Sequence, residues 1–378
     1  MVKTSKSVKE IDEAFFSLDK LVKETTSIKY LENIRSQNPS DRPVILFGAG
    51  AWGKICLRAI SEYFNKVLFC DTNSTKWGSL FEGVTVISPN QLIEKYSDSY
   101  IIIASLDYFD QIYKQLSDLN LQEQVLLPLR GFDPFVGFEN YYKVVEKHFS
   151  EFENIYNLLE DAESKQLFKS RINSCITFNN KYIIPFLSDS PQYFETGLIS
   201  LSNDEVFVDC GAYTGDTAEE FIKQTEGNFK KIYSFEPEES KHKHYLEKFS
   251  DDSRVELLPY GVWKENDTLK FNALDNVCSS FEESGDIEIK VVSIDDSLEL
   301  SPVTFMKMDI EGSELEALRG AEETIRKYKP KLAICIYHKP LDIVQIPQYL
   351  KEIVPEYKIY LRHYSMGIGE TVCYAIAE

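Results

Sequence analysis

Two turns rich in glycine constrain the fold of this chain more than any other feature of its sequence. The first, residues 48–53, reads GAGAWG, and the second, residues 209–216, reads DCGAYTGD. Each follows a short and almost entirely apolar run, at 44–47 and at 206–208. Such runs are typical of parallel strands covered on both faces, and glycine allows a tight turn from such a strand into a helix. The sequence therefore predicts two α/β units.

Apolar runs and helical periodicity divide the 378 residues into four regions. These are N-terminal helices at 1–40, a Rossmann-like α/β domain at 41–130, a helical connector at 131–200 and a second α/β domain at 201–378. The first domain has room for three or four strands, which we predict at 44–47, 67–70 and 101–104. The predicted strands of the second domain are 206–210, 231–236, 254–258, 304–309, 332–337, 357–362 and 371–376, with extra strand structure at 262–296.

The charge of the chain argues against two classes of partner. Lys and Arg total 41 against 61 Asp and Glu, a net charge of −20, and such a surface repels nucleic acid and anionic membranes. No apolar run approaches the roughly 18 residues of a membrane-spanning helix, and the first 15 residues lack the apolar core of a signal peptide. The seven cysteines form no CxxC pair, which argues against structural zinc and disulfides. We expect a cytoplasmic protein; the sequence leaves its oligomeric state open.

The first turn carries the GxGxxG pattern of dinucleotide-binding proteins. Asp71 ends the next predicted strand, 18 residues after Gly53, where a carboxylate that binds a ribose would lie. A complete dinucleotide site needs two mononucleotide-binding halves, however, and this domain has room for one. Three interpretations stay open at this point: a purely structural turn, a nucleotide or sugar-nucleotide site, and an NAD site.

The second turn has a different pattern, DxGxxxG, which is a variant of the S-adenosylmethionine loop. This cofactor is a sulfonium cation without phosphates, so its site needs close backbone approach and carboxylates rather than a row of amide donors. Glu236 ends the next predicted strand, 21 residues after Gly215, where it can accept both ribose hydroxyls. Pro237 then suits the first position of a helix. The predicted cofactor-binding residues are Asp209, Gly211, Ala212, Tyr213, Thr214, Gly215, Asp216, Glu236 and Pro237.

Several further segments follow in a characteristic order. They are FEP at 235–237, VSIDD at 292–296, KMDIEGSELEALRGA at 307–321, YHKP at 337–340, RHYS at 362–365 and ETVCYA at 370–375. Together with VFVDCGAYTGDT they make residues 201–378 resemble the FkbM-type S-adenosylmethionine-dependent methyltransferases. The first domain resembles the half-Rossmann modules of surface-sugar biosynthesis proteins, on the segment CDTN at 70–73 followed by Gly78, Gly83, Ser88 and Pro89.

The FkbM resemblance implies a fold and an activity. The fold is the doubly wound α/β sheet of class I methyltransferases, with seven strands and an antiparallel last strand. The activity is O-methylation, often of a sugar, a glycan or a related small molecule, with S-adenosylmethionine as cofactor. The resemblance carries Asp209, Gly211, Gly215 and Glu236 over as cofactor contacts.

The acceptor side is expected at the carboxyl ends of the later strands. Asp309 and Glu311 follow the fourth strand, and an extended backbone would place both on one face, where they could act as a base or hold a cation. We predict His338 as the base, because its ordinary pKa suits proton transfer near neutrality. Arg362 and His363 end the sixth strand and are predicted to bind substrate, although Arg362 could instead pair with Glu370. The sequence leaves a metal requirement open.

Two alternatives to a methyltransferase remain. One is an NAD-dependent sugar-nucleotide enzyme that uses the first turn, but the first domain lacks the Tyr-x-x-x-Lys pair that many such enzymes carry. The other is a non-catalytic adaptor whose two α/β units bind nucleotide ligands.

Overall fold

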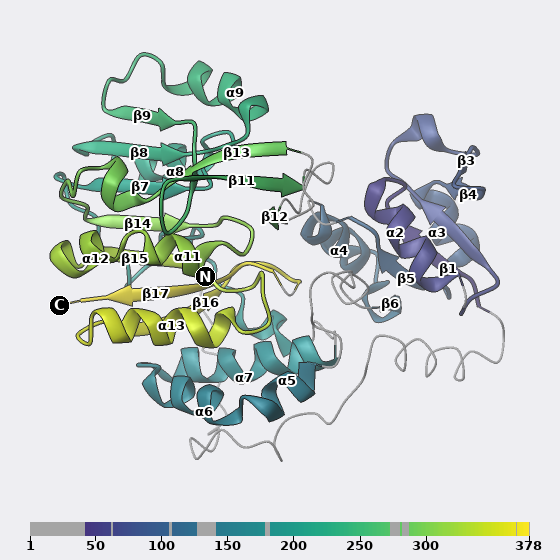
Figure 1. Ribbon diagram of the computed structural model, residues 1–378. Helices are drawn as coiled ribbons and strands as arrows, with labels where there is room; N and C mark the ends of the chain where they lie inside the picture. The colour runs from purple at the N-terminus through teal and green to yellow at the C-terminus, as the bar shows by residue number, and fades with distance from the viewer. Residues whose placement is uncertain are drawn as a thin grey trace, which may run out of the picture.

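The computed structural model describes residues 42–61, 63–105, 108–126, 141–177, 182–272, 280–281, 287–367 and 369–377. The helices predicted at 1–40, and residues 131–140 of the predicted connector, lie outside the described residues. Figure 1 shows the remaining elements as an N-terminal domain, a larger C-terminal domain and three helices beneath the latter.

The N-terminal domain is a six-stranded sheet in the order β3-β4-β2-β1-β5-β6. Its central strand is fully buried and pairs in parallel with β2 and β5, as continuous apolar runs predict. Its strands are β1 (Val44–Phe47), β2 (Val67–Cys70), β3 (Leu80–Phe81), β4 (Val84–Ile87), β5 (Tyr100–Ile103) and β6 (Val125–Leu126), and its helices are α2 (Ala51–Ile60), α3 (Pro89–Tyr96) and α4 (Phe109–Asp118). The sheet has more strands than the three or four expected, since the sequence did not predict β3, β4 and β6. Strands β3 and β6 have two residues each and form the edges of the sheet, and β4 is buried only at its last two residues.

The C-terminal domain is a seven-stranded sheet in the order β16-β17-β15-β14-β7-β8-β9. Strand β17 runs antiparallel to both of its neighbours, and the other described pairs of this sheet are parallel. The predicted class I fold is therefore confirmed. The strands are β7 (Val206–Cys210), β8 (Lys231–Phe235), β9 (Val255–Leu258), β14 (Phe305–Met308), β15 (Lys331–Cys335), β16 (Lys358–His363) and β17 (Thr371–Ile376).

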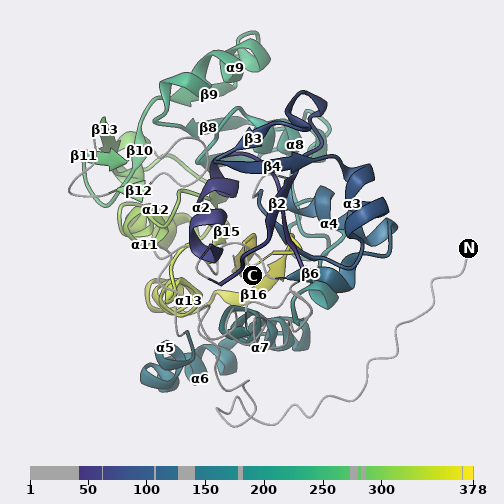
Figure 2. The ribbon, with the colours of Figure 1, turned by 90° about the vertical axis from the view of Figure 1, so that its right-hand side faces the viewer.

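Helices cover both faces of this sheet (Figure 2). They are α8 (Asp216–Gln224), α9 (Glu239–Phe249), α10 (Ile294–Ser297), α11 (Glu314–Arg319), α12 (Glu322–Tyr328) and α13 (Asp342–Ile353). The helical periodicity of residues 313–328 predicts one continuous helix, but the structure has two, α11 and α12. The chain breaks at Gly320, where an added Cβ would lie 2.0 Å from the Trp263 carbonyl oxygen, so close packing there requires glycine.

The extra strand structure predicted at 262–296 forms a separate small sheet. Its order is β10-β13-β11-β12, with β10 (Gly261–Val262), β11 (Asp267–Asn272), β12 (Ser280–Phe281) and β13 (Ile287–Val292). In Figure 1 β11 and β13 extend from the C-terminal domain on the side of the N-terminal domain.

The connector contributes three helices, α5 (Tyr141–Lys147), α6 (Phe149–Leu158) and α7 (Ala162–Thr177). Helix α7 packs against the edge strand β16, where Ser164 Oγ accepts the Leu361 amide at 2.9 Å. Arg171 donates from Nε to Thr371 Oγ1 at 3.0 Å, and both side chains are buried. These helices therefore cover the edge of the C-terminal sheet rather than merely link two domains.

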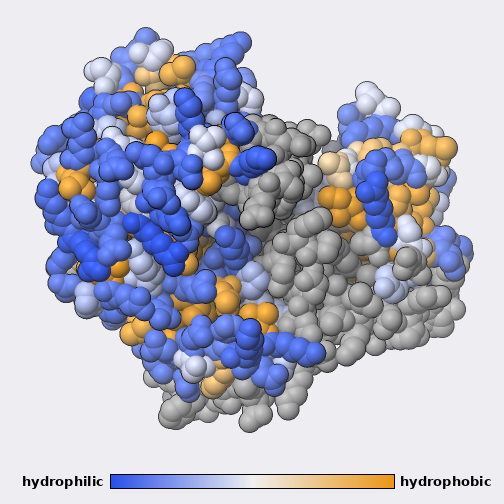
Figure 3. Space-filling view, viewed as in Figure 1, coloured by the Kyte–Doolittle hydropathy of each residue, from blue (hydrophilic) through white to orange (hydrophobic). Residues whose placement is uncertain are grey.

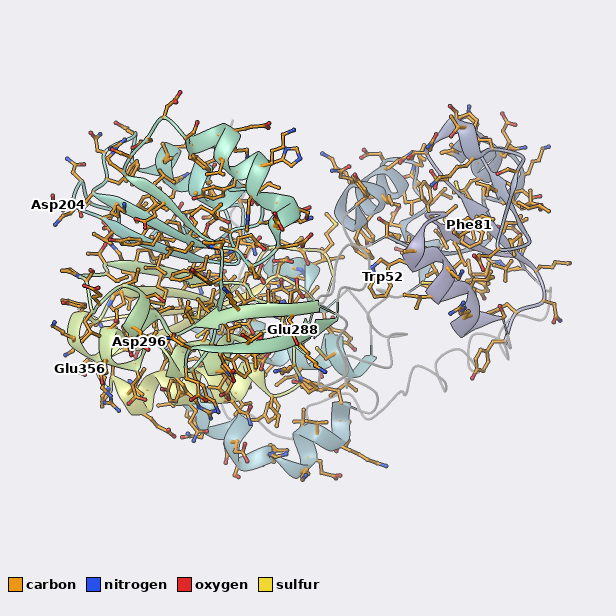
Figure 4. All side chains as sticks on the ribbon, turned by 45° about the horizontal axis from the view of Figure 1, so that its top comes forward. Trp52, Phe81, Asp204, Glu288, Asp296 and Glu356 are labelled. Atoms are coloured by element: carbon orange, nitrogen blue, oxygen red, sulfur yellow. The ribbon has the colours of Figure 1, made fainter. Side chains whose placement is uncertain are left out.

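The face of the C-terminal domain seen in Figure 3 is mostly hydrophilic with scattered hydrophobic patches, and hydrophobic residues are also visible on the N-terminal domain. Among the labelled residues of Figure 4, Asp204, Glu288, Asp296 and Glu356 lie on the C-terminal domain, and Trp52 and Phe81 on the N-terminal domain. The four acidic side chains are all exposed, so negative charge is spread over the outside of the larger domain. Within the described residues, no helix has the length and apolar character needed to cross a membrane.

Candidate cofactor and acceptor site

The second glycine turn packs so closely that two of its positions require glycine. Gly211 has φ +79°, and an added Cβ would lie 1.9 Å from the Asp309 carbonyl oxygen. Gly215 has φ +83°, is the N-cap of α8, and would bring a Cβ to 2.5 Å from the Phe249 ring. Both positive φ values and both short distances exclude other residues. The turn thus brings the backbone of 211–215 against the carboxyl ends of β7 and β14.

Glu236 lies at the end of β8 with its carboxylate held by backbone amides. Its Oε2 accepts the Tyr213 amide and its Oε1 accepts the Glu238 amide, both at 2.8 Å. The residue is 7% exposed, and burial raises its pKa above the usual value despite these two bonds. Each oxygen keeps a second acceptor position, so the fixed carboxylate can accept two further hydroxyls.

A buried ion pair connects the second glycine turn to strand β14. Lys307 Nζ, on β14, lies 3.2 Å from Asp209 Oδ1 and donates to the Gly211 carbonyl at 2.7 Å. Burial raises the pKa of Asp209 to about 6, although the charge of Lys307 opposes the rise. Neither Asp209 oxygen has a hydrogen-bond partner among the described residues. The sequence did not point to Lys307, because a lysine in an apolar strand pattern gives no sign of its partner.

The other predicted cofactor residues lie around this turn in different ways. Ala212 is fully buried, and Thr214 is partly buried. Tyr213 is 53% exposed, with Lys241 Nζ 4.4 Å from the centre of its ring. Asp216 is exposed in the first turn of α8.

One expectation about the next helix is wrong. Pro237 does not open α9, because that helix begins at Glu239 with Glu238 as its N-cap. On α9, His242 is partly buried, and its Nε2 lies 2.8 Å from the Glu236 carbonyl oxygen. His242 therefore helps to position the strand end that carries Glu236.

Three carboxylates converge on His338 at the neighbouring strand ends. Its Nε2 lies 3.4 Å from Asp309 Oδ1 and 3.5 Å from Glu311 Oε2, and its Nδ1 lies 3.0 Å from Glu314 Oε1. The imidazole side chain is only 6% exposed. The structure thus brings together the three residues that the sequence predicted for catalysis and adds Glu314.

The backbone at Asp309 and Glu311 is not the extended strand that the sequence predicted. Strand β14 ends at Met308, and Glu311 adopts φ +55°, so Asp309 and Glu311 do not alternate along an extended strand. Glu314 is buried, and its Oε1 accepts the Ile310 amide at 2.9 Å. A loop tied down by Glu314 therefore turns both predicted carboxylates toward His338.

The electrostatics do not support the prediction that His338 is the base. Burial alone would lower its pKa, but the charges of Glu314, Glu311 and Asp309 raise it to about 10. The imidazole is then protonated near neutral pH and cannot accept a proton. The sequence argument used the ordinary pKa of histidine and did not include three nearby carboxylates.

Asp309 is held by two phenols. Its Oδ2 accepts Tyr193 OH at 2.9 Å, and its Oδ1 accepts Tyr337 OH at 3.1 Å. Burial favours a higher pKa for Asp309, but the charges of His338 and Lys307 and these two bonds hold its pKa below the usual value. Tyr193 comes from the segment that follows the connector helices, so a residue far from the DIEG stretch completes the site.

With this geometry in view, the chain can be compared with known proteins. Residues 209–357 match the family model described as the methyltransferase FkbM domain. A methyltransferase FkbM from Methylobacillus flagellatus KT is similar over 91% of this chain and 93% of its own, at 25% identity and a TM-score of 0.70. Residues 209–357 form an FkbM methyltransferase domain. Residues 40–127 match a second model, described as C2185-like, N-terminal.

Other solved structures resemble only part of the chain. An rRNA methylase from Streptococcus thermophilus is 17% identical over 47% of this chain and 90% of its own, with a TM-score of 0.32. Fibrillarin from Aeropyrum pernix is 12% identical over 48% and 70%, with a TM-score of 0.31. Such scores carry no argument about function. The search of curated proteins gave no match.

Arg362, predicted to bind substrate, lies on the edge strand β16 and is bonded within the protein. The residue is 7% exposed, its Nη2 lies 2.8 Å from Asp161 Oδ2, and its Nη1 donates to Ser164 Oγ at 3.1 Å. It therefore joins β16 to the start of α7. Glu370, the alternative partner considered for Arg362, accepts a hydrogen bond from Gln192 Nε2 to its Oε2 at 2.6 Å.

His363 is also a structural residue rather than a substrate contact. Its side chain is fully buried, with Nδ1 2.9 Å from Thr371 Oγ1 and Nε2 3.0 Å from the Gly367 carbonyl oxygen. Burial, helped by the charge of Arg171, lowers its pKa to about 3, so the ring stays neutral. Both ring nitrogens are engaged within the protein.

The first glycine turn, outside the FkbM domain, is closely packed and is bonded to other residues of its own domain. An added Cβ at Gly48 would lie 2.4 Å from the Ala104 carbonyl oxygen, and one at Gly53 would lie 2.2 Å from the Gly48 carbonyl oxygen. Asp71 Oδ2 lies 2.8 Å from Lys76 Nζ, and that amine also donates to the Ala49 carbonyl at 2.9 Å. These contacts favour the structural interpretation of the first turn.

Proposed function

We propose that this FkbM-type methyltransferase uses S-adenosylmethionine to methylate a hydroxyl of a sugar, a glycan or a related small molecule. The observation that carries the proposal is the Glu236 carboxylate, which two amides fix at the end of β8 beside the second glycine turn. A carboxylate in this position can accept both hydroxyls of the cofactor's ribose. Asp209 is buried under the same turn, where its ion pair with Lys307 and the bond from Lys307 to the Gly211 carbonyl fix the loop beside the cofactor position.

The transfer itself is an in-line displacement. The acceptor oxygen attacks the methyl carbon, the carbon–sulfur bond breaks, and sulfur leaves as a neutral thioether. The enzyme has to align three atoms and receive the hydroxyl proton. The cluster of Asp309, Glu311 and His338 lies at the strand ends next to Gly211, since Gly211 packs directly on the Asp309 backbone.

Within this cluster we assign the proton-accepting role to Glu311. Its side chain is 39% exposed, whereas that of Asp309 is 23% exposed. A substrate hydroxyl can therefore reach Glu311 more readily than it can reach Asp309. Asp309 and His338 then orient the acceptor and the loop. The proposed compartment is the cytoplasm, as the cysteine pattern indicates.

The test uses methyl-labelled S-adenosylmethionine and a panel of sugars, sugar nucleotides and glycans. We expect release of S-adenosylhomocysteine together with a labelled O-methyl group on at least one acceptor. Glu311→Gln should lower turnover at least roughly tenfold at unchanged cofactor affinity. Glu316→Gln is the matched control, since Glu316 pairs with Arg319 on α11 and lies outside the cluster. Cofactor binding without transfer to any acceptor would favour the non-catalytic adaptor instead.

A further inference from the structure

Three carboxylates surround the imidazole of His338, and a fourth acidic side chain lies close by. Asp309, Glu311 and Glu314 all lie within 3.5 Å of a ring nitrogen. A fourth carboxylate, Asp342, is 4% exposed, and its Oδ2 accepts the Lys339 amide at 2.7 Å. Buried like charges repel strongly unless a cation compensates them.

We propose that Asp309, Glu314 and His338 bind a divalent transition-metal ion, with Mn²⁺ as the representative ion, and that the ion displaces the proton from one His338 ring nitrogen. This inference rests on the proposed function and deepens it, since the ion would hold the acceptor hydroxyl beside the methyl group. The three residues each offer one ligand atom, and these atoms all lie within 4.8 Å of one another.

The buried polar atoms of the cluster point the same way. The His338 side chain is 6% exposed and that of Glu314 is 1% exposed. Three buried polar atoms of the cluster have no hydrogen-bond partner among the described residues: both His338 ring nitrogens and Glu314 Oε2. The Nδ1 atom of His338 does lie at ion-pair distance from Glu314 Oε1. Buried polar atoms are normally satisfied, so three such atoms in one cluster indicate a ligand.

The ligand set suits a particular kind of ion. Two carboxylates and one imidazole are the donors of transition-metal sites, whereas Mg²⁺ prefers oxygen ligands and retained water. Donor atoms about 2.0–2.2 Å from one ion can be at most about 4.4 Å apart, so the three side chains have to rotate toward one another to bring both carboxylates to the same ring nitrogen. Glu311 is exposed enough to remain available to the substrate.

The experiment titrates Mn²⁺ into the EDTA-treated full-length protein and follows free Mn²⁺ by electron paramagnetic resonance. We expect one saturable site, and at least a tenfold loss of affinity in both His338→Gln and Glu314→Gln. Glu316→Gln should bind Mn²⁺ as the native protein does. A thermal melt of each variant checks that it folds. If Glu314→Gln unfolds, the test depends on comparing the Mn²⁺ affinity of His338→Gln with that of the native protein.

The proposal is overturned if the native protein shows no saturable Mn²⁺ binding, or if binding is unchanged in the variants that fold. Cofactor binding, measured on the same EDTA-treated protein, separates this failure from that of the proposed function. If S-adenosylmethionine binds and methyl transfer proceeds in EDTA without Mn²⁺ binding, only the metal site is wrong. If Mn²⁺ binds at these residues but S-adenosylmethionine does not bind in any condition, the metal site stands and the methyl-transfer function fails.

Discussion

Each glycine turn is followed, at the end of the next parallel strand, by a carboxylate that accepts two backbone amides. One amide belongs to the glycine turn, and the other belongs to the residue two positions after the carboxylate. Asp71 accepts the amides of Ala49 and Asn73 at 3.0 and 2.8 Å. Glu236 accepts those of Tyr213 and Glu238, both at 2.8 Å. The two turns differ in what else reaches the carboxylate: Lys76 pairs with Asp71, whereas Glu236 forms no ion pair in the part of the chain that the structure describes.

This difference favours the assignment of the cofactor to the second turn, which the sequence pattern of that turn had already indicated. The first turn has the better-known GxGxxG pattern, yet its carboxylate is neutralised by Lys76. Burial favours a raised pKa at Asp71, but the bonds from Lys76 and two amides keep its pKa below the usual value. At Glu236 burial prevails, and its pKa is raised. An uncompensated buried carboxylate costs stability and is therefore a better sign of a ligand site than a glycine pattern.

The largest expected effect contrasts one glycine from each turn. Gly211→Ala should destabilise the protein by about 4 kcal/mol, because a positive φ and a clash with the Asp309 backbone both oppose the methyl group. Gly50→Ala should change stability by no more than about 1 kcal/mol, since Gly50 has φ −141° and nothing lies within 4 Å of an added Cβ. Urea denaturation measures both. Equal effects would contradict the packing described for the two turns.

The next effect is on cofactor affinity. Glu236→Ala should weaken S-adenosylmethionine binding by about 1.5–3 kcal/mol, the range for hydrogen bonds to a charged group. Asp71→Ala is the control from the first turn and should leave the affinity unchanged. Isothermal titration calorimetry measures both. If Asp71→Ala weakens binding as much as Glu236→Ala does, the assignment of the cofactor to the second turn is wrong.

The smallest effect concerns the stability of the first turn and its dependence on pH. Asp71→Asn should cost about 1–2 kcal/mol at pH 7, reduced by solvent screening because the Lys76 side chain is 38% exposed. The folded pKa of Asp71 is lowered, so its contribution is present above the unfolded pKa of about 3.9 and is lost as the pH falls through the folded pKa. Denaturation of both proteins between pH 7 and pH 3 should show that the difference between their free energies of unfolding becomes smaller in acid. If the difference in the free energy of unfolding instead increases in acid, the pairing of Asp71 with Lys76 is contradicted.

Much of the fold could be predicted from the sequence. The runs of apolar residues located all seven strands of the C-terminal sheet, because buried parallel strands are continuous in sequence and contrast with their flanking turns. Strands β3 and β6 have two residues each, too few to show a pattern. The break between α11 and α12 depends on the contact of Gly320 with Trp263, which no local pattern records.

The site could be predicted only in part, for a similar reason. Strand ends and spacing placed Asp309, Glu311 and His338 at one edge of the sheet, and the structure brings them together. Tyr193 and Glu314 could not be predicted, since their roles depend on contacts made by loops. Arg362 looked like a substrate contact because its partner Asp161 lies in a helix that packs on β16 only in the folded chain.

The most direct test of this account is a calorimetric titration of the full-length protein with S-adenosylmethionine and, separately, with NAD. The account predicts one saturable site for S-adenosylmethionine, weakened in Glu236→Ala and unaffected in Asp71→Ala, and no saturable heat with NAD. Saturable NAD binding that is lost in Asp71→Ala, with no binding of S-adenosylmethionine, would contradict it.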